Sequence, residues 1–149
     1  MSETRIDTTA FFEALATEMN AQTERYRLYG EADMDPVLVM RRPDGDFRVR
    51  LHFAELTCSD VTEVDEAEAH LSDFRLEGDL EAWRAMFDDI RANGSAAGLW
   101  TINSLALMGD KIVVAGSDPM GTDKFSRFNQ TLQEFLDGAA RLDRAATAS

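Results

Sequence analysis

The sequence predicts an α+β fold, in which a mixed or antiparallel sheet is covered on one face by three helices. The first observation is the order of the periodic segments, which runs helix, hairpin, strand, helix, hairpin, helix. The second is that most successive strands are joined by short turns, which favours antiparallel neighbours. The amphipathic helices must then bury their apolar stripes against the sheet.

Apolar residues recur every three or four positions in each expected helix, which gives each one a single apolar face. The middle helix has the clearest ends, because Asp79 is a favourable N-cap and Gly94 a favourable stop. The last helix carries the widest apolar stripe, with three phenylalanines. The expected helices span residues 8–22, 79–92 and 122–142.

The first expected hairpin spans residues 36–57, and Pro43-Asp44-Gly45-Asp46 supplies its turn. Its second arm alternates apolar and basic side chains from Phe47 to Phe53, as expected of a half-buried strand, and the alternation slips near Ala54. Residues 63–68 form an acidic stretch that we expect to be an exposed loop or a frayed turn. The other expected strands are residues 73–77 and a second hairpin of residues 99–107 and 111–116, joined by the turn Gly109-Asp110.

Composition limits the class of protein. With 149 residues, the chain fits a single domain with a core at 8–142 and a frayed C-terminal tail. A net charge of −13 argues against nucleic-acid binding and against docking on anionic membranes. The single cysteine, Cys58, fits a reducing compartment, and no apolar run is long enough for membrane insertion or a signal peptide. We therefore expect a cytoplasmic protein.

The sequence has no motif for metal, cofactor or nucleophilic chemistry. The two histidines, His52 and His70, lack the spacing of a zinc site, and the glycines form no phosphate-binding loop. No Gly-x-Ser-x-Gly segment joins a strand to a helix. We therefore assign no catalytic residue, no metal ligand and no cofactor.

Two groups of residues are candidates for ligand binding. Aromatic and aliphatic side chains concentrate in the C-terminal half, where they either fill an ordinary core or line a pocket. The candidate lining residues are Trp83, Met86, Phe87, Ile90, Trp100, Ile102, Phe125, Phe128, Leu132 and Phe135. Four arginines at the first hairpin either contact an acidic head group or pair with the protein's own acids. These are Arg41, Arg42, Arg48 and Arg50.

Two segments carry a resemblance to a known family. Residues 74–83 (FRLEGDLEAW) run from a strand into a helix, and residues 103–110 (NSLALMGD) end in Gly-Asp ahead of a phenylalanine-rich final helix. In these features the chain resembles the sterol-carrier-protein (type 2) family. The resemblance implies a sheet of about five strands and an apolar tunnel for sterols, fatty acids or fatty acyl chains. One departure is the extra expected strand at 111–116, since the family's last helix follows the Gly-Asp almost directly.

These observations predict non-catalytic binding or transfer of an apolar small molecule, driven by burial of its apolar surface. Two other functions remain open. One is an acid–base isomerase or hydratase that uses a carboxylate of raised pKa in an apolar pocket. The other is an interaction subunit, for which a homodimer is compatible with the sequence.

Overall fold

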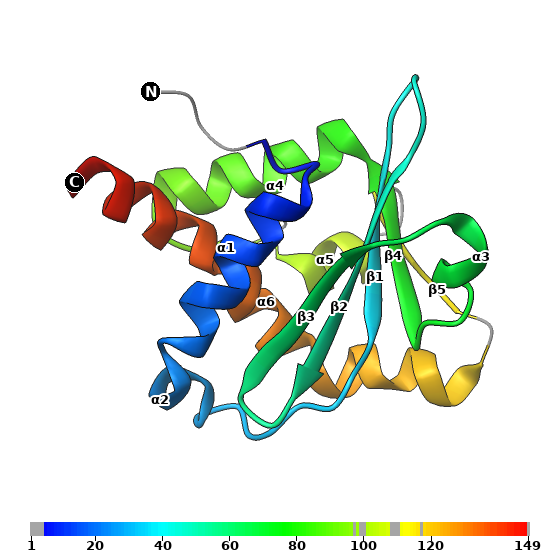
Figure 1. Ribbon diagram of the computed structural model, residues 1–149, viewed down its shortest axis with the longest axis horizontal. Coiled ribbons are helices and arrows are strands. Elements are labelled where there is room, and N and C mark those ends of the chain that lie inside the picture. Colours follow the sequence, from blue (N-terminus) through cyan, green and yellow to red (C-terminus); the bar gives the residue numbers. More distant parts are fainter. Residues whose placement is uncertain (1–4, 97, 99–100, 108–110, 117, 149) are drawn as a thin grey trace.

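The computed structural model describes residues 5–96, 98, 101–107, 111–116 and 118–148, with side chains except at 103, 107 and 143–148. Five strands form one mixed sheet in the order β3-β2-β1-β4-β5, which confirms the expected α+β class (Figure 1). The strands are β1 Pro36–Arg41, β2 Phe47–Ala54, β3 Thr57–Glu63, β4 Phe74–Asp79 and β5 Ile112–Ala115. The helices are α1 Thr9–Asn20, α2 Thr23–Tyr26, α3 Glu66–Ala69, α4 Leu80–Asn93, α5 Ile102–Leu107 and α6 Pro119–Ala148.

The β1–β2 hairpin forms as the alternation predicts. Leu38 pairs with Val49 in antiparallel register, and alternate side chains of β2 are buried. Strand β1 also pairs in parallel with β4, so that Arg41 lies beside Asp79. This parallel pair makes the sheet mixed, and it places the end of β1 next to the beginning of α4.

The two faces of the sheet are covered unequally. On one face, Leu38 and Met40 of β1 join the main apolar cluster, to which α1, α4, α5 and α6 contribute. On the other face, Val37 and Val39 form a small cluster with Val64 and Ala69 at α3. The short helix α3 begins with a capping box between Asp65 and Glu68. The acidic stretch at 63–68 therefore contains the end of β3 and most of α3, instead of being only a loop.

Only one arm of the expected second hairpin is confirmed: the strand expected at 111–116 is present as β5, but the strand expected at 99–107 is wrong over its described part. Residues 102–107 form helix α5, and β5 pairs with β4 in antiparallel register. Thr101 marks the start of α5, because its Oγ1 accepts a hydrogen bond from the backbone N of Ser104 at 3.2 Å. A short apolar run fits either a strand or a buried helix, and here the hydroxyl cap accompanies the helix. The expected turn Gly109-Asp110 lies outside the described residues.

Strand β3 is an additional element, most of which lies in residues 58–62, for which we made no prediction from the sequence. It pairs with β2, and the register shifts between His52 and Phe53, close to the slip that the sequence predicts. Its side chains are mostly polar; three of the seven are exposed, and Cys58 is buried. A polar edge strand has no strong apolar alternation, which explains why its pattern is hard to recognise.

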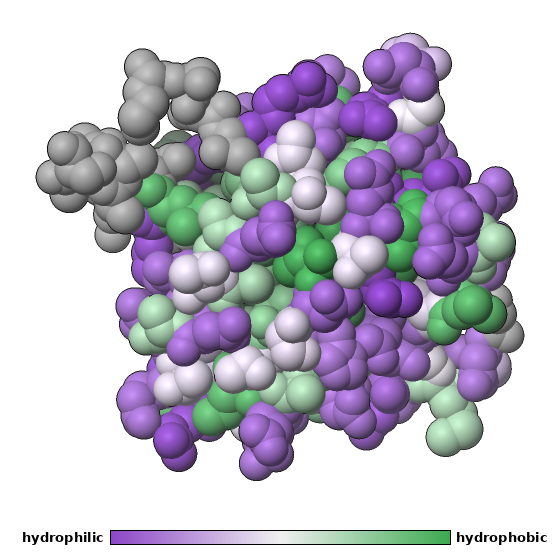
Figure 2. All heavy atoms as spheres, in the orientation of Figure 1, coloured by the Kyte–Doolittle hydropathy of each residue, from purple (hydrophilic) through white to green (hydrophobic). Residues whose placement is uncertain are grey.

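The surface is largely hydrophilic on the face drawn in Figure 2, where apolar side chains appear as separate small patches. In the part of the chain that the structure describes, the most exposed large apolar residues are Leu28, Leu71 and Met120. Among the described residues, no helix combines the length and the apolar composition needed to cross a bilayer.

Tyr26 provides a test of the packing between α2 and α6. Its ring is buried, and its hydroxyl has no hydrogen-bond partner among the described residues. Because an unpaired buried hydroxyl carries an uncompensated desolvation cost, we expect Tyr26→Phe to preserve stability or raise it by about 1 kcal/mol. Tyr29→Phe is the matched control, since it removes a 3.0 Å hydrogen bond from the Tyr29 hydroxyl to Glu134. Urea denaturation of both variants measures the difference, and a destabilised Tyr26→Phe would contradict this interpretation.

Candidate functional site

Helix α4 supplies four of the predicted lining residues. Trp83, Met86, Phe87 and Ile90 are fully buried on one helix face, as their spacing of three and four residues requires. The indole Nε1 of Trp83 donates a 3.0 Å hydrogen bond to the backbone oxygen of Val39. This bond satisfies the only polar atom of the indole and fixes α4 against β1.

Helix α6 contributes four further predicted lining residues to the same apolar cluster. Leu132 and Phe135 are fully buried, Phe125 is nearly so, and Phe128 is partly buried against the same cluster. Two edge-to-face ring contacts join the helix to the sheet. The Phe135 ring lies 5.1 Å from that of Phe53, and the Phe125 ring lies 5.7 Å from that of Phe74. Those contacts fasten α6 to β2 and β4 at two separate points.

Helix α5 packs against β5 and α6 and presents Ile102 and Leu105 to the cluster. Its first backbone N–H, at Ile102, donates a 2.6 Å hydrogen bond to the Oε1 atom of Gln133 on α6. The predicted lining residue Trp100 lies outside the described residues. The structure thus brings the nine other predicted lining residues into one apolar cluster.

Among the described residues of α6, Asp137 is the most buried charged side chain. Its Oδ1 accepts hydrogen bonds from the backbone N of Ala96 at 3.1 Å and from Nε2 of Gln133 at 2.9 Å. Burial raises the pKa of the Asp137 carboxyl from 3.8 to about 6, with the two hydrogen bonds opposing the shift. Asp137 and Gln133 thus connect Ala96 and the first residue of α5 to α6.

The four predicted head-group arginines do not form one site. Arg41 pairs with Asp79 at 3.0 Å, and Arg42 pairs with the buried Asp7 at 3.0 Å. The other two pairs lie on the outer face of β2, where Arg48 contacts Asp46 at 3.4 Å and Arg50 contacts Asp60 at 3.7 Å. Each arginine therefore has an acidic partner of the protein's own, which was one of the two interpretations of the sequence.

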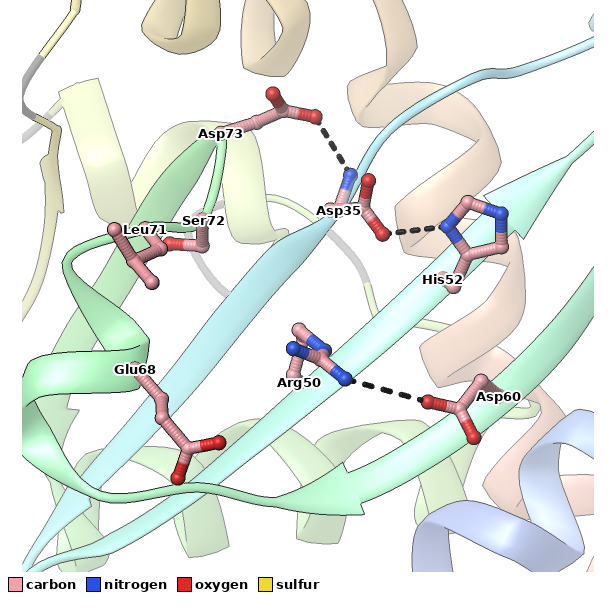
Figure 3. A pocket seen from close by; sticks show the side chains of 8 residues that line it. All are labelled: Asp35, Arg50, His52, Asp60, Glu68, Leu71, Ser72 and Asp73. Carbon is pink, nitrogen blue, oxygen red and sulfur yellow. Dashed lines mark hydrogen bonds and ion pairs between the residues drawn. The ribbon is translucent and has the colours of Figure 1, made fainter.

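A polar hollow of about 280 Å³ lies on the outer face of the sheet (Figure 3). There the Nδ1 atom of His52 is 2.5 Å from Oδ1 of Asp35, whose backbone N donates to Oδ2 of Asp73 at 2.7 Å. Lys124 of α6 contacts the same Asp73 oxygen at 3.3 Å. These groups link β2, the start of β1, the start of β4 and α6, and acidic groups predominate among the lining residues.

Neither thiol nor metal chemistry gains support from the described residues. Burial raises the pKa of the Cys58 thiol to about 12, which keeps it protonated near neutral pH. Within the described ranges, no three His, Cys, Asp or Glu side chains are placed to hold a metal ion.

Sequence reasoning did not single out Leu80 and Arg84, which line a hollow together with Arg41 and Arg42. The two segments are about 40 residues apart, and they meet only because β1 pairs in parallel with β4. A single sequence contains no signal for that pairing. The same is true of Asp35 and Asp73, which hydrogen-bond across the same strand pair.

The mixed five-stranded sheet, with helices over its apolar face, is a fold like that of sterol carrier protein 2. The chain is similar to a crystal structure of sterol carrier protein 2, with a TM-score of 0.66 and 22% sequence identity. The match covers 91% of this chain and 97% of that chain, which establishes the fold. No protein-family model matches the sequence. No curated protein matches it either.

Proposed function

We propose that the protein binds or transfers an apolar small molecule, held between the sheet and helices α4, α5 and α6. The fold supports this proposal, because the similar structure is named as a carrier of sterols. The observation that carries it is the apolar cluster itself, in which α4, α5 and α6 all direct aromatic and aliphatic side chains toward the same face of the sheet.

The proposed ligand space lies between the two ring contacts that fasten α6 to the sheet. Leu132 falls between Phe125 and Phe135 on α6 and is fully buried. Helix α5 faces the same region with Ile102 and Leu105, and it is short. Moving a short helix exposes less apolar surface than moving α4 or α6, so we propose that α5 shifts to admit the ligand.

Burial supplies the binding energy. Each buried CH₂ group contributes about 0.8 kcal/mol, so a chain of about twelve carbons gains roughly 10 kcal/mol before costs. Loss of ligand freedom and rearrangement of side chains offset part of that gain. The balance is compatible with micromolar binding without any polar contact.

Two measurements test the proposal. Native mass spectrometry of the protein purified without added lipid is expected to detect a bound apolar molecule. The neutral dye Nile red is expected to bind saturably, and a long-chain alcohol is expected to displace it. Absence of both a co-purified ligand and saturable dye binding would contradict the proposal.

Leu132→Phe tests the position of the ligand. Where space exists beside Leu132, the larger ring fills it, so we expect Nile red affinity to fall roughly tenfold with thermal stability unchanged. In a region already filled, the same substitution costs about 1–3 kcal/mol through overpacking. Leu28→Phe is the matched control, because Leu28 is 85% exposed and lies outside the cluster. Lower stability with unchanged dye affinity would place the ligand elsewhere.

A further inference from the structure

Two polar side chains of α6, Gln133 and Asp137, lie next to buried members of the apolar cluster. Their sequence neighbours Leu132 and Leu136 are fully buried in it. A spacing of four residues places Gln133 and Asp137 on the same face of the helix. There the Nε2 atom of Gln133 donates a 2.9 Å hydrogen bond to Oδ1 of Asp137. We call this pair the Gln133–Asp137 clamp.

The clamp binds the backbone at two places. Oδ1 of Asp137 also accepts a 3.1 Å hydrogen bond from the backbone N of Ala96, which follows the end of α4. Oε1 of Gln133 accepts a 2.6 Å hydrogen bond from the backbone N of Ile102, the first residue of α5. Among the side chains that the structure describes, Gln133 makes the one hydrogen bond that joins α6 to α5.

Gln133 can fill this position because an amide group has both donors and an acceptor. Its NH₂ group donates to the carboxylate of Asp137, which leaves its oxygen for the N–H of Ile102. The first N–H groups of a helix have no partner within the helix. Because Ile102 is fully buried, an N–H left without Gln133 would carry an uncompensated desolvation cost.

Helix α5 has fewer other anchors than the helices around it. Helix α6 is attached to the sheet by two ring contacts, and α4 buries four large apolar side chains. Helix α5 has six residues, and of its described side chains only Ile102 and Leu105 are buried. The position of α5 therefore depends strongly on the hydrogen bond from Ile102 to Gln133, and a shift of α5 away from α6 breaks it.

We propose that the Gln133–Asp137 clamp sets how fast a ligand enters and leaves, by holding α5 closed against the apolar cluster. The inference rests on the proposed function and adds control of its kinetics. The clamp is closed both with and without ligand, so each passage of the ligand requires the Ile102 bond to open. Loss of the bond then raises the association and dissociation rate constants together and leaves their ratio, the Kd, unchanged.

Gln133→Met tests this proposal, because methionine keeps the length of the side chain and lacks the amide donors and the strong acceptor. Stopped-flow fluorescence measures the rate constants for Nile red. We expect both to rise roughly tenfold, as for loss of one buried hydrogen bond, with less than a twofold change in Kd. Hydrogen exchange of the Leu105 amide, which donates to the backbone oxygen of Thr101 at 2.9 Å, should accelerate by a similar factor in the ligand-free protein.

Asn20→Leu is the matched control. Asn20 is also a helical amide with two hydrogen bonds, since its Nδ2 donates to the backbone oxygen of Cys58 at 3.0 Å and its Oδ1 accepts from the backbone N of Cys58 at 2.9 Å. These bonds join α1 to β3, whereas α5 packs mainly against β5 and α6. The control should lower stability in urea without changing the dye rate constants or the exchange of the Leu105 amide.

The possible results separate the two proposals. Unchanged dye kinetics in Gln133→Met would overturn the role of the clamp and leave the proposed function standing. A faster dissociation alone, with a weaker Kd, would place Gln133 in contact with the ligand and would also overturn kinetic control. Absence of saturable Nile red binding by the unmodified protein would overturn both proposals.

Discussion

Gly121→Ala is expected to destabilise the protein by about 3 kcal/mol, because the first turn of α6 packs directly on backbone. A Cβ atom at Gly121 would collide with the carbonyl oxygen of Asp73 and lie 2.9 Å from its carbonyl carbon. Asp73 cannot move freely, since its backbone N donates to Asp35 and its side chain contacts Lys124. Thermal unfolding should show a midpoint lower by roughly 6–12 °C.

Gly138→Ala, in the same helix, is the matched control. Its Cβ atom would meet Cγ of Glu18 at 3.4 Å and Cδ2 of Leu15 at 3.5 Å, which are ordinary contacts. Alanine favours a helix interior over glycine by about 0.5–1 kcal/mol, so this substitution should stabilise the protein. Opposite signs for the two substitutions are the expected result. Equal effects would show that α6 does not begin against Asp73.

Asp137→Asn is expected to stabilise the protein by about 2–3 kcal/mol at pH 7. Both hydrogen bonds that Asp137 accepts use Oδ1, which asparagine retains. Burial raises the carboxyl pKa to about 6 in the folded state. Between about pH 4 and pH 6 the folded state therefore binds more protons than the unfolded state, and stability falls as pH rises. The asparagine variant lacks this loss.

The difference between the two proteins isolates Asp137, because every other group titrates in both. Urea denaturation at several pH values should give equal stability below about pH 4 and a gap that is complete above about pH 6. A constant gap across that range, or a less stable variant at pH 7, would contradict the raised pKa. The same variant tests whether the Asp137 contact to Ala96 depends on charge.

Local patterns were enough to predict the elements with strong periodicity. The α4 stripe from Trp83 to Ile90 and the Pro43–Asp46 turn gave the correct elements, because each depends on residues close in sequence. The segment 102–107 was expected to be a strand and is a helix, since a short apolar run has no unique period. Strand β3 was hard to recognise because its exposed side chains are polar.

The candidate site also has one part that the sequence predicts and another part that it does not. Burial of the predicted lining residues follows from helix faces, which the sequence encodes locally. The hollow at Arg41 and Arg84 depends on the parallel pairing of β1 with β4, which only the folded chain specifies. The sequence does not indicate that Asp137 is buried, because a charged residue in an amphipathic helix lies just as often on the solvent-exposed face as within the apolar stripe.

The position of the bound chain is the most direct test of the proposed function. Intermolecular NOEs should be measured between ¹³C-labelled dodecanoate and the unlabelled protein at saturation. A chain held in the apolar cluster is expected to contact the side chains of Leu132, Ile102 and Leu105. Contacts confined to the exposed Leu28, Leu71 or Met120 would place the chain on the surface and contradict an enclosed ligand.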